Sequence, residues 1–307
     1  MSEPAGEYML SFSEINLENA QLLRKYFMHQ PFRTCDYTIG AVFEWRVYMK
    51  SLFALDSGML IMSADYPGEQ RCYMYPVGNG ELTGALQSVE AHARMCGHGL
   101  TYCAVPEEGV RELRARYGDR CVIKDHRDWA DYLYNLRDLI DFPGKPFHTQ
   151  RNHFNRFKRE NPSHRLVPIT KENLPSALAF LDEYALRAPA DKPIEAEEML
   201  RARELLTVFD KLGQKAAYIE VNGVVVALAV GEVVGDTLYV HVEKARTDYA
   251  GAYQAIVSMF ADFAAEDGTR YINREDDSGE EGLRYSKMAY RPIRLVDKYW
   301  VSVNKEG

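Results

Sequence analysis

The sequence has few cysteines and no long apolar run, and both absences narrow the class of protein. Five cysteines in 307 residues are an odd number without dense spacing, which favours reduced thiols over the disulfide framework of a small secreted domain. The longest apolar stretch, residues 224–230, is far shorter than the roughly 20 residues that a membrane-spanning helix needs. The first residues are acidic and lack the regions of a signal peptide. We therefore expect a cytoplasmic protein without a transmembrane segment.

An excess of positive charge is also absent. With 37 Lys and Arg against 45 Asp and Glu, the net charge is −8, which argues against a surface that is basic throughout and against DNA as a partner. There is no Gly-x-Ser-x-Gly, P-loop or dinucleotide motif and no sign of a permanently bound cofactor. The nearest approach to a metal-ligand set is His92, Cys96, His98 and Cys103. Their spacing matches no zinc pattern, so the sequence predicts no metal.

The residues that are present describe an ordinary globular chain with an internal duplication. The composition, 46% hydrophobic and 27% charged, allows a sizeable core, and the length suggests two domains. Residues 107–117, EEGVRELRARY, return as residues 280–290, EEGLRYSKMAY. A helical pattern that ends at glycine and a short strand precede each copy, and hairpin-like strands precede those. We predict two related α+β domains over 1–142 and 143–307; the alternative is two unrelated domains.

The segment between the halves is broken by proline and glycine at 143–146 and then becomes basic. We predict a linker helix over 147–160 with Phe154 and Phe157 facing inward. A basic stripe with aromatic residues can hold an RNA backbone. The candidates for binding a tRNA or nucleotide donor are Arg151, Asn152, Asn155 and Arg156. The alternative is a linker helix that only neutralises acidic neighbours.

The order of elements resembles the acyltransferase fold called GNAT, and two copies in tandem resemble its aminoacyl-transferring relatives. Three segments resemble the bacterial family named after the C-terminal domain of phosphatidylglycerol lysyltransferase, and the resemblance covers nearly the whole chain. These segments are YMYPVGNGE at 73–81, DYLYNLRDLIDFPGKPFHTQRNHFNRF at 131–157 and REDDSGEEGLRYSKMAYRP at 274–292. The membrane-embedded part of the lipid-modifying enzymes has no counterpart in this sequence.

The resemblance implies two tandem GNAT domains, each a mixed, mostly antiparallel sheet flanked by helices. It also implies transfer of an acyl or aminoacyl group from acyl-CoA or aminoacyl-tRNA, as a co-substrate, to an amine or hydroxyl acceptor. The acceptor would be a small molecule, a peptide or a lipid headgroup. A second class remains open, in which a tandem GNAT module binds tRNA, a nucleotide or a peptide without catalysis, because a fold does not fix a function.

In this fold the donor lies where the fourth and fifth strands part, with phosphates at the start of the next helix, where unpaired N–H groups favour anions. Here that turn is residues 245–254, with Gly251 and Tyr253 as candidate donor-binding residues. The usual Q/R-x-x-G-x-G/A pattern is met only by Arg246 and Gly251-Ala252 at altered spacing. The alternative is that Gly251 only tightens a strand–helix junction.

The strand over 236–245 supplies candidate catalytic side chains. Regular alternation would place Tyr239, His241 and Glu243 on one face. Acyl transfer to an amine needs a group that takes the proton of the nucleophile. His241 and Glu243 are the candidates for this role, with His241 also a candidate substrate contact. The alternative is that this polar face is solvated or hydrogen-bonded to the neighbouring half.

The densest charge lies at residues 274–290. Ser278 and Glu281 have the spacing of a capping box that opens a helix. Glu275 and Asp276 lie at the mouth of the fifth strand, where they are candidates for catalysis by holding the ammonium group of a substrate. The D-x-[DN]-x-[DN]-G spacing of a calcium loop is missing.

The helix that follows carries three further candidates. Arg284 and Lys287 are three residues apart, so they share a face. They could bind a carboxylate or phosphate of the substrate, or pair with the acidic run. Tyr290 is a candidate general acid for the leaving group, and the alternative for it is a packing role.

Overall fold

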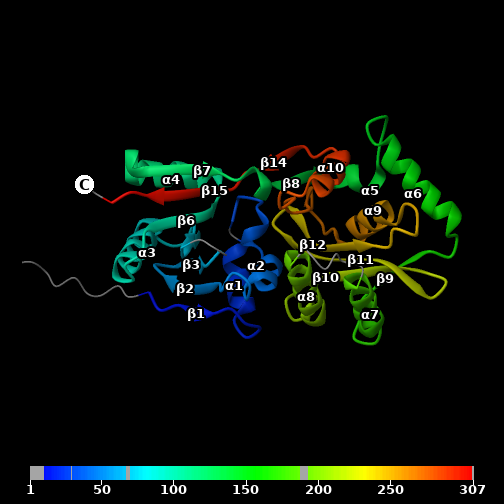
Figure 1. The fold of residues 1–307 in the computed structure, drawn as a ribbon, viewed down its shortest axis with the longest axis horizontal. Helices are drawn as coiled ribbons and strands as arrows, with labels where there is room; N and C mark the ends of the chain where they lie inside the picture. The colour runs from blue at the N-terminus through cyan, green and yellow to red at the C-terminus, as the bar shows by residue number, and fades with distance from the viewer. Residues whose placement is uncertain (1–9, 29, 67–69, 187–192, 306–307) are drawn as a thin grey trace, which may run out of the picture. The chain divides into compact units, whose positions relative to one another are not determined.

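The computed structural model describes residues 10–28, 30–66, 70–186 and 193–305, which divide into two compact units (Figure 1). The first unit takes in the chain up to Arg127 and its end from Asp297 onward, and the second unit is Asp128–Val296. The sequence predicted ranges of 1–142 and 143–307. The units differ from those ranges because the first unit includes the end of the chain, and the second unit begins at Asp128, ahead of the predicted boundary.

The first unit is built on one mixed sheet with four α-helices in its described residues. Its strands are β1 (Ser13–Glu14), β2 (Leu52–Asp56), β3 (Met59–Ala64), β4 (Cys72–Met74), β5 (Val77–Gly78), β6 (Leu100–Val105), β7 (Cys121–Asp125) and β15 (Tyr299–Val303). Its helices are α1 (Ala20–Phe27), α2 (Ile39–Trp45), α3 (Leu82–Met95) and α4 (Glu107–Tyr117). The strand order is β1-β2-β3-β4-β6-β15-β7, and β5 pairs with β3.

The helix α3 follows from the predicted apolar stripe. Leu86, Val89 and Ala93 are buried on one face of α3, which packs against β2, β3 and β6. Gly97, with a φ of 73°, lets the chain leave the helix in a backbone conformation that side chains disfavour. The parallel pair β4–β6 needs such a crossover helix.

The second unit has a seven-stranded sheet in the order β14-β8-β13-β12-β11-β10-β9. Its strands are β8 (Asp131–Asn135), β9 (Arg165–Pro168), β10 (Lys215–Val221), β11 (Val224–Val234), β12 (Thr237–Ala245), β13 (Tyr271–Asn273) and β14 (Arg294–Val296). Its helices are α5 (Leu136–Asp141), α6 (His148–Glu160), α7 (Leu174–Ala185), α8 (Pro193–Val208), α9 (Ala252–Ala264) and α10 (Glu281–Ala289). The pair β12–β13 is parallel, and the other pairs are antiparallel.

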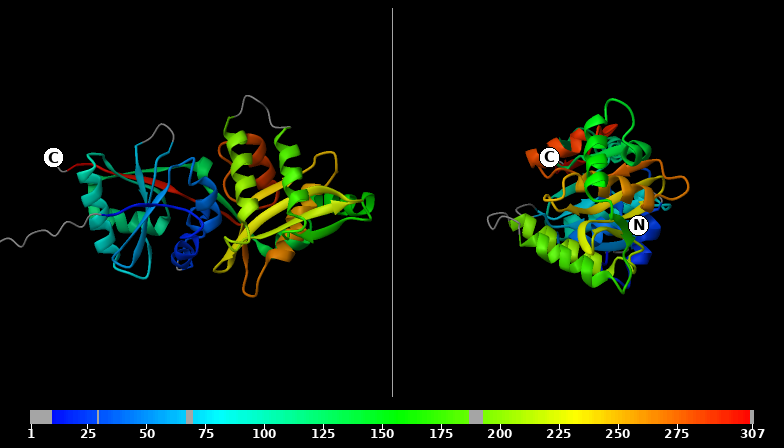
Figure 2. Two further views of the ribbon diagram at one scale, coloured as in Figure 1. Left: turned by 90° about the horizontal axis from the view of Figure 1, so that it is seen from below. Right: turned by 90° about the vertical axis from the view of Figure 1, so that its right-hand side faces the viewer.

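Helices cover both faces of this second sheet. The apolar helix α9 packs on β10, β11 and β12, with α5 and α6 against it. On the opposite face, α7 and α8 lie side by side (Figure 2). The core under α9 includes Phe157, Val240, Ile256 and Phe260. The predicted linker helix is confirmed as α6, in which Phe157 is buried and Phe154 is partly buried.

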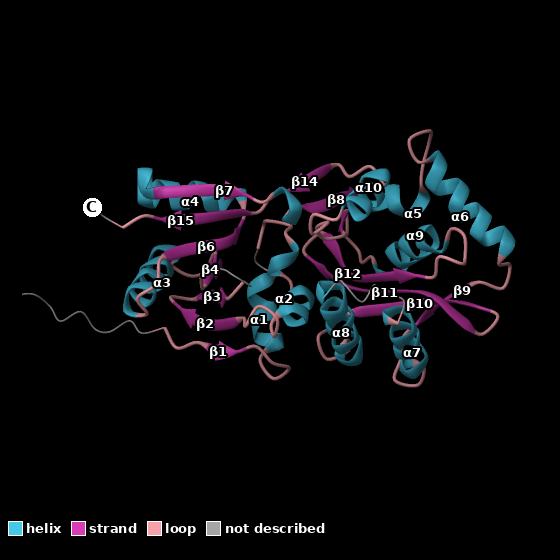
Figure 3. Ribbon diagram, in the orientation of Figure 1, coloured by secondary structure: helices cyan, strands magenta, loops and turns pink. Residues whose placement is uncertain are grey.

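Two strands complete sheets formed by distant parts of the chain. Strand β8 lies between β13 and β14, although about 135 residues separate it from β13, and β15 lies between β6 and β7 (Figure 3). Residues 294–296 form β14 in the second unit, and residues 299–303 form β15 in the first. Residues 131–135, which lie in the predicted range 1–142, form β8 of the second unit. The predicted order of hairpin-like strands, helix, strand and repeated helix is confirmed in both halves.

Two local expectations are wrong. Cys72 and Cys103 lie on the adjacent strands β4 and β6 and form a disulfide with a Cα–Cα distance of 5.9 Å, so these two are not reduced thiols. Ser278 does not cap α10: that helix begins at Glu281, and the Ser278 hydroxyl donates to Asp276 instead. Among the helices in the described ranges, none is long and apolar enough to cross a membrane.

Candidate active site

A β-bulge in β12 sets the directions of the candidate catalytic side chains. Val240 pairs with Gly231 and Val242 pairs with Val230, so His241 has no residue opposite it on β11. A Cβ at Gly231 would lie 2.2 Å from the carbonyl oxygen of Tyr239, so only glycine allows this close approach of the two strands.

The bulge reverses the alternation of side chains along β12. Glu243 pairs with Ala229, which belongs to the core under α9, so Glu243 faces α9. His241 faces away from α9, toward Glu232 on β11. The expectation that His241 and Glu243 share one face is therefore wrong, because a strand with one extra residue shifts every later side chain to the opposite face.

The strands β12 and β13 part at the place expected from the order of elements. Their parallel pairing ends at Tyr239 and Asn273, whereas β12 continues to Ala245. Two charge pairs cross the gap beyond this point. Arg274 Nη2 lies 2.5 Å from Glu243 Oε1, and His241 Nδ1 lies 2.8 Å from Glu275 Oε1.

Arg274 is the central residue on the α9 side of the gap. Its guanidinium lies 4.5 Å from the ring centre of Tyr290 and 5.7 Å from that of Tyr134. Burial disfavours its charge, but Glu243 outweighs this effect, so the pKa of Arg274 is raised above its usual value. Its Nη1 atom is buried and has no hydrogen-bond partner among the described residues. A buried donor without a partner is costly, and such groups are concentrated at functional sites.

Tyr290 is buried beside Arg274, at the C-terminal end of α10. Burial raises the pKa of its hydroxyl, while a hydrogen bond with Gln254 acts in the other direction. The phenol therefore keeps its proton at neutral pH and can donate it. This geometry brings two predicted residues, Glu243 and Tyr290, into contact with one arginine.

On the other side of the gap, His241 lies between two carboxylates. Its Nε2 is 3.2 Å from Glu232 Oε1, in addition to the 2.8 Å contact with Glu275. Burial alone would lower the pKa of His241, but the two carboxylates raise it to about 10. The imidazole is therefore protonated at neutral pH and cannot accept a proton as a base. The triad carries one net negative charge, and Glu275, whose side chain is 21% exposed, is its accessible end.

Arg284 and Lys287 anchor the acidic loop that follows β13 through hydrogen bonds. Arg284 donates to Asp277 at 2.8 and 3.0 Å and to Asp128 at 2.6 Å. The pKa of Asp277 is lowered because these bonds and that of Tyr132 outweigh burial. The Lys287 ammonium donates to the backbone carbonyls of Arg274 and Asp276, and burial lowers its pKa. Both cations therefore hold the loop.

The loop has a backbone that needs this support. Glu275 and Ser278 have φ values of 57° and 47°, a region that costs non-glycine residues free energy. The half-buried Asp276 accepts bonds from the Ser278 amide and hydroxyl, both at 3.0 Å. Arg274 meets Glu243 on one face of the sheet, and Glu275 meets His241 on the other.

The expected donor turn is occupied by protein. Gly251, with a φ of 85°, precedes α9, and a Cβ there would lie 2.2 Å from the backbone oxygen of His153 in α6. Helix α6 therefore covers this turn. Tyr253, in the first turn of α9, has its hydroxyl 2.9 Å from that of Tyr184 on α7.

Several polar side chains of the basic helix α6 bond to other residues of the helix or to the segment before it. Arg151 donates to the carbonyls of Phe142 and Gly144 at 2.5 and 2.8 Å, which fastens the approach to the helix. Arg156 pairs with Glu160 at 2.8 Å, and Asn152 lies 3.3 Å from His148. The side chains of Asn152, Asn155 and Arg156 are exposed.

Comparison with known proteins places the chain in a family. The family described as "Phosphatidylglycerol lysyltransferase, C-terminal" matches residues 30–302. The chain belongs to this family. A crystal structure of a conserved protein of unknown function from Bacteroides thetaiotaomicron is similar to 96% of this chain and 100% of that chain, with a TM-score of 0.91 and 32% identity.

Two more distant structures share the fold. L-PGS from Bacillus licheniformis matches with a TM-score of 0.68 and 15% identity over 94% of this chain and 92% of that one. FemX matches with a TM-score of 0.63 and 9% identity over 96% and 98%. The predicted α+β fold of two tandem GNAT domains is confirmed.

A curated relative, an uncharacterised protein of Mycoplasmoides gallisepticum, is 20% identical over 178 residues. The match spans 58% of this chain and 58% of that protein, which is less than two thirds of its length.

Two residues of this site, Arg274 and Glu232, were not among the candidates from the sequence. Arg274 stands beside an acidic run, a position typical of a solvated ion pair. Glu232 is a lone carboxylate in the apolar strand VVVALAVGEVV, and it follows a glycine. Gly-Glu inside a buried strand was a usable signal, because an interior glycine often marks a bulge and a buried acid needs a partner.

Proposed function

We propose that this chain is an aminoacyltransferase that moves the aminoacyl group of an aminoacyl-tRNA to an amine or hydroxyl acceptor, at the gap between β12 and β13. The observation that carries the proposal is the buried Nη1 of Arg274, which lies beside Glu243 and Tyr290 and has no hydrogen-bond partner in the described part of the chain. Transfer from an ester needs a base, a donor for the oxyanion and an acid for the leaving oxygen. These three residues offer the three functions within one site.

In the proposed reaction, the acceptor nitrogen or oxygen attacks the ester carbonyl carbon, and Glu243 takes the acceptor proton. The Arg274 Nη1–H group donates to the oxygen that becomes negative. The bond from the carbonyl carbon to the ribose oxygen then breaks, and Tyr290 gives its proton to that oxygen. Glu243 returns the acceptor proton to Tyr290 through solvent, so the site is restored without a redox change.

The triad of Glu232, His241 and Glu275 supports the choice of an aminoacyl group. An aminoacyl ester carries an α-ammonium group, whereas an acetyl group carries none. The triad has one net negative charge, accessible at Glu275. A buried site of that charge favours a cation more strongly than one in water. We assign Glu275 to the ammonium group, with Asp276 beside it.

The covered turn at Gly251 supports tRNA over coenzyme A as the carrier. A pantetheine pyrophosphate would need free N–H groups at the start of α9, and His153 of α6 lies against that turn. A tRNA donor would not need this turn, because its phosphates would lie outside the sheet. We assign Asn152, Asn155 and Arg156 on the exposed face of α6 to the tRNA backbone, with Arg151 holding the helix in place.

The test measures transfer from a mixture of charged tRNAs to small amines, peptides and lipid headgroups. We expect Glu243→Gln and Arg274→Lys each to lower the transfer rate roughly 100-fold or more, with folding retained. The matched control is the pair of exposed Arg165 and half-buried Glu220 in the same unit, 2.8 Å apart. Arg165→Lys and Glu220→Gln should leave the rate unchanged.

Each other outcome selects a different function. Transfer from acetyl-CoA, with none from charged tRNA, would show that the donor assignment is wrong. Tight tRNA binding without turnover across all acceptors would favour a binding module. Full activity in both Glu243→Gln and Arg274→Lys would remove the site assignment altogether.

A further inference from the structure

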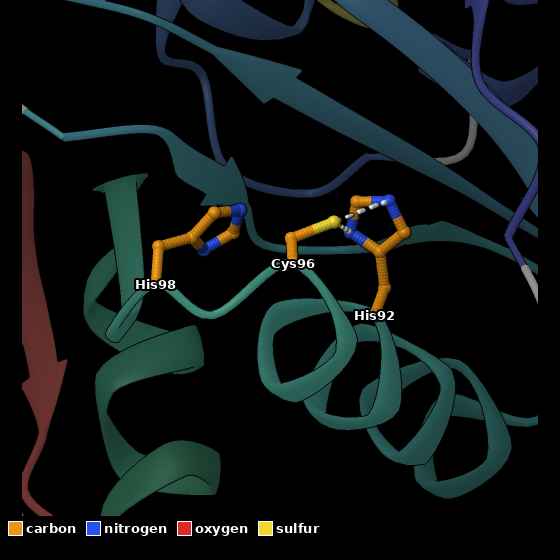
Figure 4. Close-up of side chains that lie close together, drawn as sticks. All are labelled: His92, Cys96 and His98. Atoms are coloured by element: carbon orange, nitrogen blue, oxygen red, sulfur yellow. Dashed lines mark hydrogen bonds between the residues drawn. The ribbon is translucent and has the colours of Figure 1, made fainter.

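Three potential metal ligands gather in the first unit, far along the chain from the residues assigned to transfer. His92 lies in the last turn of α3, Cys96 ends that helix, and His98 lies in the turn that follows. One ligand atom from each lies within 4.8 Å of the others. In Figure 4 the sulfur of Cys96 points at the imidazole of His92, and the ring of His98 lies on the other side of the cysteine.

The distance between the two helical ligands fits a single ion. Cys96 Sγ lies 3.6 Å from His92 Nε2. Tetrahedral zinc, with bonds of about 2.3 Å to sulfur and about 2.0–2.1 Å to nitrogen, places these two ligand atoms roughly 3.6 Å apart. Residues four apart on a helix share a face, so α3 supplies this spacing without distortion.

His92 is held in the orientation that a ligand needs. The Tyr73 hydroxyl lies 2.6 Å from its Nδ1, and the ring of Phe12 packs edge-on with centroids 4.9 Å apart. These contacts leave Nε2 to face Cys96. Metal-binding histidines commonly have such a partner on the second nitrogen.

His98 supplies the third ligand. Its Nδ1 is buried and has no hydrogen-bond partner among the described residues. The residue lies between Gly97, with a φ of 73°, and Gly99. The ligand atoms of the three residues lie within 4.8 Å of one another. The flanking glycines allow His98 to move by about 1 Å, which would bring its nitrogen to the distance that separates two ligands of one zinc ion.

We propose that Cys96 Sγ, His92 Nε2 and one nitrogen of His98 form a binding site for a divalent transition metal of the zinc class. One thiolate and two imidazoles favour Zn²⁺ over Mg²⁺ or Ca²⁺, which prefer oxygen ligands. Cys96 is exposed, so the fourth position is open to water. A bound metal would also offset the negative charge of the Cys96 thiolate at the C-terminus of α3, where the helix dipole disfavours negative charge.

The proposed site departs from the sequence-based expectation of no metal, and tertiary contacts are the reason for the difference. The His-x₃-Cys-x-His spacing matches no common zinc pattern. Cys103, the fourth residue of the set noted in the sequence, is bonded to Cys72. Cys96 is exposed at the end of α3. The proposal is independent of the transfer site, which lies in the second unit.

The test is a titration of the whole chain, first stripped with a chelator, with Co²⁺ followed by Zn²⁺. We expect about one Co²⁺ per chain, with thiolate charge-transfer absorption and tetrahedral ligand-field bands, both lost when Zn²⁺ displaces the ion. Cys96→Ser should remove the charge-transfer absorption, and His98→Ala should weaken binding. Tyr73→Phe should weaken binding roughly 10- to 100-fold through loss of the His92 contact.

Matched controls use a second free thiol and an exposed histidine outside the cluster. Cys121→Ser and His148→Ala should bind Co²⁺ as the parent chain does. Absence of these bands from the parent chain at stoichiometric Co²⁺ would overturn the proposal, and this result needs no variant to fold. Equal loss in Cys96→Ser and Cys121→Ser would overturn it as well, because it would show unspecific thiol binding.

Discussion

At the scale of single residues, the second unit buries charged side chains in groups whose charges are only partly compensated. Arg274 neutralises Glu243, yet its Nη1 has no hydrogen-bond partner among the residues that the structure describes. His241 neutralises one of two carboxylates and leaves a net negative charge. Removing one member of a buried pair costs about 3–5 kcal/mol. The charged residues are therefore tested best by replacements that keep their shape, such as Glu243→Gln.

The protonation of His241 gives a prediction for pH. In the folded chain its pKa is raised to about 10, against about 6.5 when unfolded. The folded state then binds one more proton than the unfolded state between these values. The group stabilises the fold fully below about pH 6.5, and this contribution falls by roughly 1.4 kcal/mol per pH unit until it is lost near pH 10.

The measurement is NMR of the histidine ring resonances across this range, with His241 identified by its absence in His241→Gln. We expect the His241 signal to keep the shift of a protonated ring well above neutral pH. Exposed His148 and His153 serve as internal references in the same spectra. Titration of His241 below about pH 7 would contradict the triad and, with it, the net charge assigned to the ammonium site.

At the scale of elements, the contact between α6 and the start of α9 excludes any side chain at residue 251. Gly251→Ala would place a Cβ 2.2 Å from the His153 oxygen and would also force alanine to a φ of 85°. We expect a loss of about 2–5 kcal/mol in the free energy of unfolding from strain and overpacking together. Denaturant unfolding measures this loss.

Gly223 provides the matched control for this contact. It has a φ of 83°, and a Cβ there would meet nothing within 4 Å. Gly223→Ala should therefore cost only the backbone strain, about 1–2 kcal/mol. If the two variants lost the same stability, α6 would not press on the turn, and the argument against a pyrophosphate at that place would fail.

At the scale of the whole molecule, the exchanged strands make each unit depend on a distant part of the chain. A fragment of residues 143–307 lacks β8, the strand between β13 and β14. A fragment of residues 128–296 contains every strand of that sheet. We expect the fragment 128–296 to unfold cooperatively and the fragment 143–307 to fail to fold, because a missing central strand leaves two unpaired edges.

Thermal unfolding followed by circular dichroism compares the two fragments directly. The fragment 1–142 provides the reciprocal case, since it lacks β15 between β6 and β7. Cooperative unfolding of both 1–142 and 143–307 would support the boundary that the sequence predicted. It would also show that the exchanged strands contribute little to either sheet.

The sequence by itself determined the elements, their order and the family. Apolar periodicity located α3 and α9, and glycines marked their ends, because these signals depend only on neighbours along the chain. The repeated EEG motif located α4 and α10. The same local patterns brought Glu243, Glu275 and Tyr290 into consideration, since they lie on elements that a GNAT order places around one gap.

Only the tertiary structure decided which way those residues point and what they contact. The bulge at His241 depends on the register between β11 and β12, and one extra residue changes the face of Glu243. The partners of Arg274, of Arg284 and of His92 come from other elements, so local sequence does not encode them. Sheet pairing between distant segments is a property of the folded chain, and it placed β8 and β15 where no periodicity could.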